Sequence, residues 1–337
     1  MEKILMVADC VVTEALYRKY FPAAFAAHEV EVVEDMKGYT TIDFQKLMLG
    51  TEQRGAEAFE ANPEIVEKIR EATVLVVHMS VINRQVLDAA EKLKTIFVCR
   101  GGCDNLNMEL IKERGIRLFN AASRSADAVA DYTVAMMIAE TKNMIRSAIA
   151  LANGKWEKEF SNFGHHHNLG RLTVGIIGFG EIGRRVAKRL EGFGCGVLVH
   201  DPYLPDAEVE KRGGTPVTLD RLLREADIVT LHLRLSESTK NFLGDAELGK
   251  MKKTAYLGNT ARSGLVDQEA LIEALRQHRL MGAALDVFDV EPLPADSAFR
   301  SLDNVSLTPH MAGVSCDTVD IGVELMGEAF AKHFGAI

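Results

Sequence analysis

Three side chains of different chemistry each follow an apolar run in the second half of the sequence. They are Arg262 after residues 255–259, Glu291 after 282–287 and His310 after 305–308. Such short runs read as buried strands, and in an open parallel sheet the carboxyl ends of the strands meet at one edge, where ligands bind. Each residue alone would also fit a plainer role, as a surface ion pair, a solvated loop carboxylate or a turn residue. Together they fit proton transfer on an anionic substrate, because a guanidinium holds a carboxylate at two points and an imidazole exchanges protons near neutral pH.

A glycine-rich turn follows another apolar run. The sequence VGIIGFGEIG places Gly178, Gly180 and Gly183 between a strand and a helix, in the pattern GxGxxG. These glycines permit a tight turn, close approach of the backbone to a pyrophosphate and close packing of the helix on the strand, while the helix N-terminus favours an anion. The pattern predicts a dinucleotide site that also includes Glu181 and Ile182.

The strand after this helix ends in Asp201. A carboxylate there accepts hydrogen bonds from the adenosine ribose and repels the extra phosphate of NADP, so we predict NAD as the cofactor. A hydride would then move between the nicotinamide and C2 of a small 2-hydroxy or 2-oxo acid. Arg262 would hold the substrate carboxylate and stabilise the alkoxide, and His310 would be the general acid or base. Glu291 would orient the imidazole and keep it protonated during reduction.

Apolar runs alternate with helical patterns along most of the chain, which predicts an α/β fold with parallel sheets. The expected strands of a first series are residues 4–8, 30–33, 74–78, 95–99 and 116–120, and those of a second are 174–178, 197–200, 228–233, 255–259, 282–287 and 305–308. A long helix is expected over 125–153 and a terminal helix over 317–334, whereas 36–63 is poorly patterned. The six strands of the second series match a complete dinucleotide-binding sheet.

Composition and charge exclude several classes of protein. The chain has 337 residues, enough for two domains, and a formal net charge of −9, which gives no basic footprint for nucleic acid or for an anionic membrane. It has no apolar stretch as long as a membrane helix and starts with a short run that reads as a strand. Its 5 cysteines are scattered, as free thiols of a reducing compartment would be, so we expect a cytoplasmic protein.

The sequence resembles the D-2-hydroxyacid dehydrogenase family, which includes phosphoglycerate dehydrogenases, over about residues 70–325. The resemblance is carried by GIIGFGEIG, LHLRLSESTKNFLG, NTARSGLVDQEALIEAL, GAALDVFDVEPLP and NVSLTPHMAG, in the family's order and spacing. It implies that Arg262, Glu291 and His310 are the catalytic triad. It also implies that Asp286 contacts the nicotinamide carboxamide and that Thr260 and His232 lie along the cofactor.

The same resemblance implies two doubly wound domains with a cleft between them and a discontinuous arrangement of the chain. A flavodoxin-like substrate-binding domain would comprise residues 1–121 and 308–337, and a Rossmann NAD-binding domain residues 122–307. The resemblance also implies a homodimer joined mainly through the NAD-binding domain. The stretch Arg100-Gly101-Gly102 resembles the loop whose amides bind the substrate carboxylate, and Arg100 would be either a second cation for a polar or phosphorylated tail or an interdomain salt bridge. The first 65 residues match the family least, and in the family this part normally selects the substrate acid.

Three alternatives compete with these assignments. His165, His166 and His167 suggest a metal, but neighbouring side chains of an extended run alternate in direction, so a solvated loop without a metal is favoured. Some relatives of the family sense NAD(H) and bind protein partners as corepressors with little turnover, and the triad does not exclude this role. Formate oxidation is a further alternative, against which Glu291 argues, because formate dehydrogenases of this superfamily usually have glutamine there.

Overall fold

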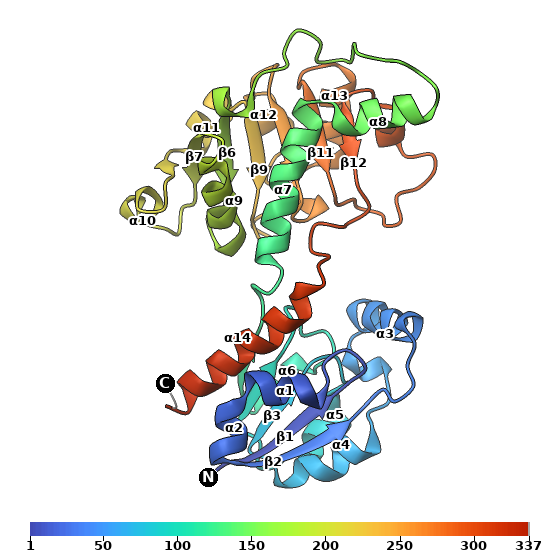
Figure 1. Cartoon of the computed structure of the whole chain (residues 1–337), viewed down its shortest axis with the longest axis vertical. Coiled ribbons are helices and arrows are strands. Elements are labelled where there is room, and N and C mark those ends of the chain that lie inside the picture. The colour runs from blue at the N-terminus through green and yellow to red at the C-terminus, as the bar shows by residue number, and fades with distance from the viewer. Residues whose placement is uncertain (336–337) are drawn as a thin grey trace. The chain divides into compact units, whose positions relative to one another are not determined.

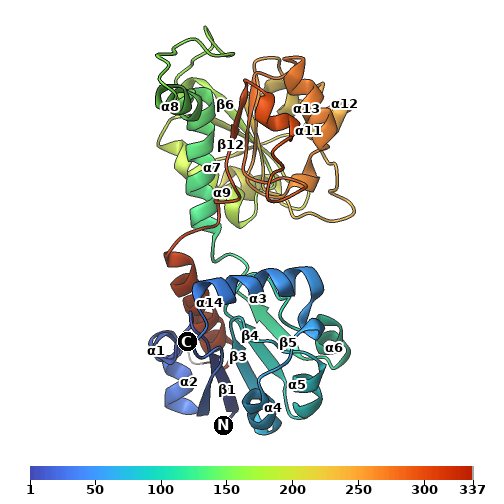
Figure 2. The same ribbon diagram turned by 90° about the vertical axis from the view of Figure 1, so that its right-hand side faces the viewer.

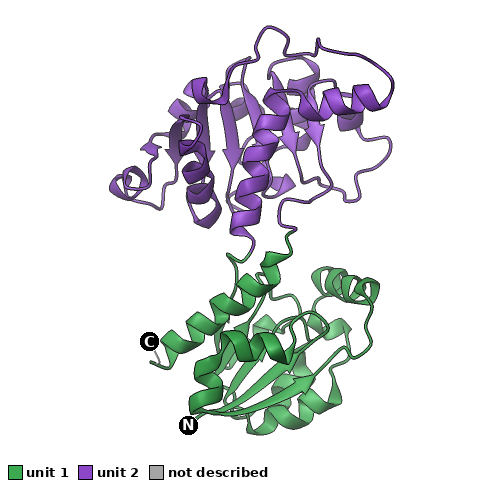
Figure 3. Ribbon diagram, in the orientation of Figure 1, with its two compact units in different colours: residues 1–124, 315–337 green, residues 125–314 purple. Residues whose placement is uncertain are grey.

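The computed structural model describes residues 1–335, in two compact units (Figure 3). Unit 1 consists of Met1–Arg124 and the chain from Ser315 onward, and unit 2 of Ser125–Val314. Both changes of unit come a few residues later than the boundaries expected from sequence. No helix of the described residues is long and apolar enough to cross a membrane.

Unit 1 is built on a five-stranded parallel sheet (Figure 1). Its strands are β1 (Lys3–Ala8), β2 (Glu29–Glu34), β3 (Val74–Val77), β4 (Thr95–Val98) and β5 (Arg117–Asn120), in the order β2-β1-β3-β4-β5. All residues of β3 and β4 are buried, because helices cover both faces of a parallel sheet. This is the flavodoxin-like order, and the strand order reverses between β1 and β3.

Two sets of helices cover this sheet. They are α1 (Glu14–Tyr20), α2 (Pro22–Ala27) and the terminal α14 (Asp317–His333) on one face, and α4 (Pro63–Lys68), α5 (Arg84–Ala89) and α6 (Met108–Glu113) on the other. The first face buries Tyr17, Phe21 and Phe330. Gly327 lets α14 approach α1 closely, since a Cβ there would lie 1.9 Å from the Tyr20 carbonyl oxygen. The terminal helix therefore completes the core of the first strand series.

The poorly patterned region contains a helix that sequence reasoning missed, α3 (Thr41–Arg54). Thr40 and Asp43 cap its start reciprocally, as in a capping box. The amphipathic pattern of its sequence is weak, because the apolar residues Ile42 and Leu49 lie on its exposed surface. Figure 2 shows α3 lying across the ends of the unit 1 strands, where its Phe44 stacks on His78.

Unit 2 is built on a seven-stranded parallel sheet, one strand more than expected. The strands are β6 (Thr173–Ile177), β7 (Gly196–His200), β8 (Thr215–Pro216), β9 (Ile228–Leu231), β10 (Tyr256–Asn259), β11 (Gly282–Leu285) and β12 (Val305–Leu307), in the order β12-β11-β10-β9-β6-β7-β8. The extra strand, β8, has two residues and lies at the edge, where a proline is tolerated. It is too short to give a sequence pattern.

Helices also cover both faces of this sheet. They are α7 (Ala126–Thr141) and α9 (Glu181–Glu191) on one face and α11 (Leu219–Glu225), α12 (Asp245–Leu248) and α13 (Gln268–Arg276) on the other, with α10 (Asp206–Glu210) after β7. Short 3-10 turns cover Ala56–Ala58, Ile69–Glu71, Leu169–Arg171, Ser263–Leu265 and Ala298–Ser301. The fold class predicted from sequence, two doubly wound parallel-sheet domains, is confirmed.

The single long helix expected over 125–153 is wrong. The chain forms α7 and then α8 (Met144–Ala152), separated by Asn143 with a left-handed backbone at φ 55°. Arg146 turns back to pair with the buried Glu140 at 2.9 Å. Asparagine tolerates this conformation better than most residues, so a polar residue inside an apolar pattern marks the break.

Candidate functional site

The glycine turn lies between β6 and α9, at the point where the strand order of unit 2 reverses. Gly178 has φ +89°, and a Cβ at Gly183 would lie 2.2 Å from the Gly178 carbonyl oxygen. A Cβ at Gly180 would meet nothing within 4 Å, so the backbone there is open to a ligand. The turn is therefore both tightly packed inside and accessible at Gly180, as a phosphate-binding turn requires.

Asp201, after β7, holds this turn. Its Oδ2 accepts a hydrogen bond from the Phe179 amide at 2.8 Å and its Oδ1 one from the Tyr203 amide at 3.0 Å. At the other end of the turn, Glu181 pairs with Arg184 and Arg185, both at 2.5 Å. The structure thus brings the predicted residues of the glycine turn together with Asp201.

His232 follows β9 on the other side of the reversal point. Its backbone packs on the turn, since a Cβ at Gly178 would lie 2.7 Å from the His232 carbonyl oxygen. Burial lowers the pKa of His232 to about 3, so the imidazole is neutral. Its Nε2 is 3.1 Å from Thr230 Oγ1, and its buried Nδ1 has no hydrogen-bond partner among the described residues. An orphaned nitrogen beside an open glycine turn fits a bound dinucleotide that supplies the missing partner.

Arg262 and Thr260 lie in the turn after β10. The buried Asn259 side chain fixes this turn, because its amide donates to the Arg262 carbonyl at 2.9 Å and its oxygen accepts from the Ala261 amide at 3.0 Å. Thr260 is held against α7 by Thr133, with 2.7 Å between the hydroxyl oxygens. The Arg262 side chain is exposed, so its charge is available to a ligand. Sequence reasoning missed the part of Asn259 in positioning Arg262.

Glu291 and His310 form a direct pair. His310 Nδ1 donates to Glu291 Oε2 at 2.8 Å, and the other Glu291 oxygen accepts from the Phe288 amide at 3.0 Å. The pair is partly exposed, and because Nδ1 is engaged, Nε2 is the nitrogen available for proton exchange. Among the residues described, no hydrogen bond or ion pair joins Arg262 to either of them. The three residues nonetheless share one edge, since β10, β11 and β12 are neighbours in the sheet.

Asp286, after β11, lies beneath the segment that carries His310. Its side chain is fully buried, and its carboxylate accepts hydrogen bonds from Thr308 Oγ1 at 2.6 Å and from the amides of Met311 and Ala312 at 2.9 and 2.8 Å. All three donors belong to the segment 308–312. His310, in the middle of this segment, has a left-handed backbone at φ 55°. Asp286 therefore holds the strained segment that carries the histidine.

The predicted substrate loop lies in unit 1, after β4. Arg100 is buried, 3.5 Å from Glu52 of α3 and 3.3 Å from Asn105 Oδ1. The Gly101 carbonyl accepts from Asn120 at 2.6 Å, and a Cβ at Gly102 would lie 2.7 Å from Asp104 Oδ2. The ion pair between Arg100 and Glu52 therefore joins two residues of unit 1.

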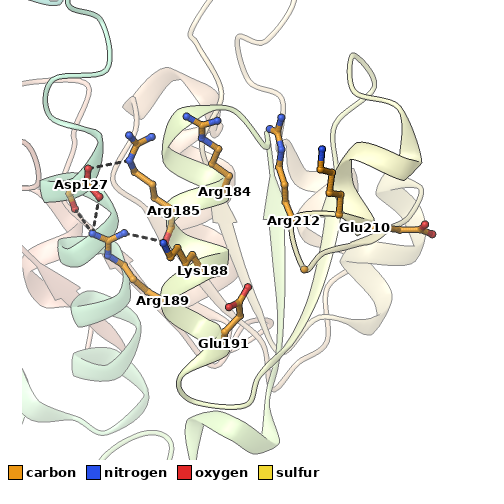
Figure 4. Close-up of a pocket in the computed structure, with 10 residues that line it drawn as sticks. Asp127, Arg184, Arg185, Lys188, Arg189, Glu191, Glu210 and Arg212 are labelled. Atoms are coloured by element: carbon orange, nitrogen blue, oxygen red, sulfur yellow. Dashed lines mark hydrogen bonds and ion pairs between the residues drawn. The ribbon is translucent and has the colours of Figure 1, made fainter. Parts of the chain in front are cut away.

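Unit 2 has two other clusters of polar and charged side chains. His166 is 2.8 Å from Asn162 Oδ1, and no group of three potential metal ligands occurs within residues 1–335. A hollow of about 1110 Å³ runs along α9, lined by charged side chains of both signs (Figure 4). Its Arg185 and Arg189 pair with Asp127 of α7, both at 3.1 Å. None of the predicted site residues lines it, so it reads as the charged outer face of a helix.

Comparison with known proteins gives the same result for sequence and structure. Residues 134–312, more than half of the chain, match the model of the D-isomer specific 2-hydroxyacid dehydrogenase NAD-binding domain. The chain is 36% identical to the hydroxypyruvate reductase of Thermotoga maritima, over 80% of this chain and 87% of that protein. It is 39% identical to the D-3-phosphoglycerate dehydrogenase of Methanocaldococcus jannaschii over 80% of this chain, which spans only 51% of that longer protein.

The solved structures agree. The D-isomer specific 2-hydroxyacid dehydrogenase of Lactobacillus delbrueckii ssp. bulgaricus, in its NAD-complexed form, matches 99% of this chain and 97% of its own with a TM-score of 0.72 and 25% identity. The glycine turn, the acidic end of β7 and the Glu291–His310 pair all lie within the matched domain. The chain therefore belongs to the D-2-hydroxyacid dehydrogenase family of NAD-dependent oxidoreductases.

Proposed function

We propose that this protein reduces a small 2-oxo acid with NADH, or oxidises the matching 2-hydroxy acid with NAD, and that His310 is its general acid and base. The observation that carries the proposal is the 2.8 Å contact between His310 Nδ1 and Glu291 Oε2 at the edge that also bears Arg262. A histidine held by a carboxylate through one nitrogen presents the other to the substrate.

The roles of the three residues follow from their chemistry. Bound NADH would supply the hydride to C2 during reduction, and bound NAD would accept it from C2 during oxidation. During reduction His310 Nε2 gives a proton to the C2 oxygen, and during oxidation it takes the proton back. Arg262 binds the substrate carboxylate and balances the negative charge that develops on the C2 oxygen. Glu291 stabilises the imidazolium through Nδ1.

Two buried residues support these groups without touching the substrate. Asp286 is a positioning residue for His310, because its carboxylate holds the 308–312 segment on both sides of the histidine. Asn259 is a positioning residue for the Arg262 turn. Buried polar groups with complete hydrogen bonding rigidify a site in this way.

The cofactor contacts are assigned to unit 2. The turn from Gly178 to Gly183, with Glu181 and Ile182, would hold the pyrophosphate, and Asp201 the adenosine ribose. His232 and Thr260 would lie along the nicotinamide half, where the orphaned His232 Nδ1 gains a partner. Unit 1 would bind the substrate, with the Gly101 and Gly102 amides on its carboxylate.

A homodimer through unit 2 is part of the proposal. Helix α8 has no buried residue and exposes Met144, Ile149 and Leu151, and Trp156 beyond it is 82% exposed. Such an apolar surface suits contact with a second copy of the chain. Sedimentation should give a dimer at micromolar concentration, and a monomer alone would contradict this assignment.

We also propose a cytoplasmic location, which the five free thiols fit.

The assay that tests the function follows NADH oxidation at 340 nm with a panel of 2-oxo acids, alongside NADPH with the same acids. We expect turnover and a clear preference for NADH, because Asp201 repels a ribose phosphate. An NAD(H)-sensing protein would bind NADH, detectable by fluorescence, yet turn over no acid in the panel. That outcome would replace the enzyme assignment with the corepressor-like one.

A further inference from the structure

Unit 1 keeps a positively charged side chain without an acidic partner at the carboxyl edge of its sheet. Arg124, just beyond β5, has Nη1 3.3 Å from His78 Nε2 and 3.3 Å from the Cys99 carbonyl oxygen. No carboxylate of residues 1–335 lies within ion-pair distance of it. Arg100 next to it differs, because Glu52 of α3 faces Arg100 at 3.5 Å.

A buried pair orients Arg124. Since an arginine only donates, His78 Nε2 must accept, and the proton of the ring therefore sits on Nδ1. That nitrogen donates to Asp9 Oδ2 at 2.9 Å. The Asp9 carboxylate also accepts from the amides of Val11, Val12 and Met79. The negative charge of Asp9 is thus engaged by His78 and by backbone amides, so it does not offset the positive charge of Arg124.

Without a bound anion, the unpaired Arg124 destabilises the folded state. Burial, together with repulsion from Arg100, lowers the pKa of Arg124 to about 10, so the guanidinium is still charged at neutral pH. Taking a charge from water without pairing it destabilises the fold. The stem of Arg124 is nevertheless packed against α14, where a Cβ at Gly322 would lie 3.2 Å from its Cδ. A guanidinium that is fixed in place without an acidic partner indicates a binding site for an anionic ligand.

Its position in the sheet is that of a ligand site. Asp9 follows β1 and His78 follows β3, the two strands between which the order of unit 1 reverses. Ligands of open α/β sheets bind outside the carboxyl ends of the strands at such a point. Helix α3 lies across this edge (Figure 2), with Phe44 stacked on His78 and Glu52 at Arg100.

We propose that Arg124, oriented by His78 and Asp9, binds a second anionic group of the substrate, which is therefore a 2-oxo or 2-hydroxy acid that carries another carboxylate or a phosphate. The inference rests on the proposed function. Within unit 1, the Gly101 and Gly102 amides receive the C1 carboxylate, and Arg124 receives the anionic tail. It places the specificity-determining cation at Arg124, whereas the sequence offered Arg100 either for this role or for an interdomain salt bridge. A guanidinium suits either tail, since it binds carboxylate and phosphate oxygens at two points.

The first test uses the unmodified protein and matched acids that differ by the tail. We would compare kcat/KM for 3-phosphohydroxypyruvate with that for hydroxypyruvate, and for 2-oxoglutarate with that for 2-oxobutyrate, with NADH. At least one acid with an anionic tail should exceed its tail-free match by about tenfold or more, as a charge-assisted contact provides. The pair that shows the preference distinguishes a phosphate tail from a carboxylate tail.

The second test is Arg124→Gln, with Arg70→Gln as the control, since Arg70 is an exposed arginine of the same unit. The Arg124 variant should lose about tenfold to a hundredfold in kcat/KM for the preferred acid with an anionic tail, mainly through KM, and little for its tail-free match. The control should change neither value. Thermal melting of both variants checks that the selective loss is not a loss of fold.

The outcomes separate the two proposals. If the unmodified protein turns over acids with and without the anionic tail with equal kcat/KM, the inference is overturned and the proposed function stands, even if the variant fails to fold. An equal loss for both acids in a folded Arg124→Gln protein does the same. If no acid of either kind is reduced, the proposed function fails and the inference falls with it.

Discussion

Two histidine–carboxylate pairs lie at the carboxyl edges of the two sheets, and they differ in burial rather than in geometry. In unit 2, His310 Nδ1 is 2.8 Å from Glu291, with side chains 48% and 37% exposed. In unit 1, His78 Nδ1 is 2.9 Å from Asp9, with side chains 5% and 0% exposed. The second ring nitrogen distinguishes them further, because Nε2 of His78 accepts from Arg124.

The difference teaches that a His–carboxylate pair does not by itself indicate catalysis. An imidazole exchanges protons with a substrate only if its second nitrogen is accessible, and the exposed pair meets this condition. A buried pair with all positions engaged instead holds the residues around it. The comparison predicts that changes in the exposed pair affect turnover and that changes in the buried pair affect stability.

The largest effect is expected for His310→Ala. Removing the general acid should lower kcat by about a hundredfold to ten-thousandfold, while the dissociation constant for NADH changes little. Single-turnover kinetics and NADH fluorescence titration measure the two quantities. Unchanged turnover with chemistry rate-limiting would remove His310 from the mechanism and erase the difference between the pairs.

Asp9→Asn should instead act on folding. Burial alone would raise the pKa of Asp9, but the hydrogen bond and charge of His78 and the amides of Val12 and Val11 outweigh it and hold this pKa below its usual value. The ionised carboxylate thus favours the folded state above the unfolded pKa. We expect the variant to lose about 2–4 kcal/mol of unfolding free energy at pH 7, as breaking a buried hydrogen-bonded pair does.

The pH dependence gives this prediction its sign. A lowered folded pKa means that the stabilisation is lost as pH falls through that value, so urea melts should show the deficit of Asp9→Asn shrinking below about pH 4. Asp88→Asn is the control, because Asp88 pairs with Arg114 on the surface and such a pair contributes about 0–1 kcal/mol. Equal stability of the two variants at pH 7 would show that the buried pair does not hold unit 1.

Arg262→Lys should have an intermediate effect on activity. A point charge cannot reproduce two-point contact with a carboxylate, so KM should rise and kcat fall, together costing about tenfold to a hundredfold in kcat/KM. Lys at an exposed position leaves the fold intact, which thermal melting verifies. Steady-state kinetics at a saturating concentration of cofactor measure KM and kcat, and an unchanged KM would argue against the carboxylate-binding role of Arg262.

The smallest and most specific effect is expected for Glu291→Gln. The amide keeps the hydrogen bond to His310 but no longer stabilises the imidazolium, so the pH above which reduction slows should fall by about one unit. Rate–pH profiles of the variant and of the unmodified protein test this for reduction. Profiles for oxidation of the hydroxy acid, in which His310 accepts the proton, complete the comparison. An identical profile would mean that the exposed pair is only a structural contact.

Much of the fold follows from local patterns. The buried strands were predictable because runs such as Val74–Val77 are apolar throughout, as strands buried on both faces are. The glycine turn was predictable because each glycine answers a steric demand of the backbone. β8 and α3 were not, since β8 has two residues and α3 exposes Ile42 and Leu49 on its surface. Asn143 broke a helix whose apolar pattern continued past it.

The order of Arg262, Glu291 and His310 after three strands, and Asp201 after β7, could be read from the sequence alone, because strand ends place such residues at one edge whatever the packing. The partners of the buried polar groups could not. Asp9, His78 and Arg124 lie far apart in the chain, and Asp286 faces the 308–312 segment only once β11 and β12 are neighbours. Short-range patterns determine which elements form, whereas the burial and pairing of a charged side chain depend on residues that only the folded sheet brings together.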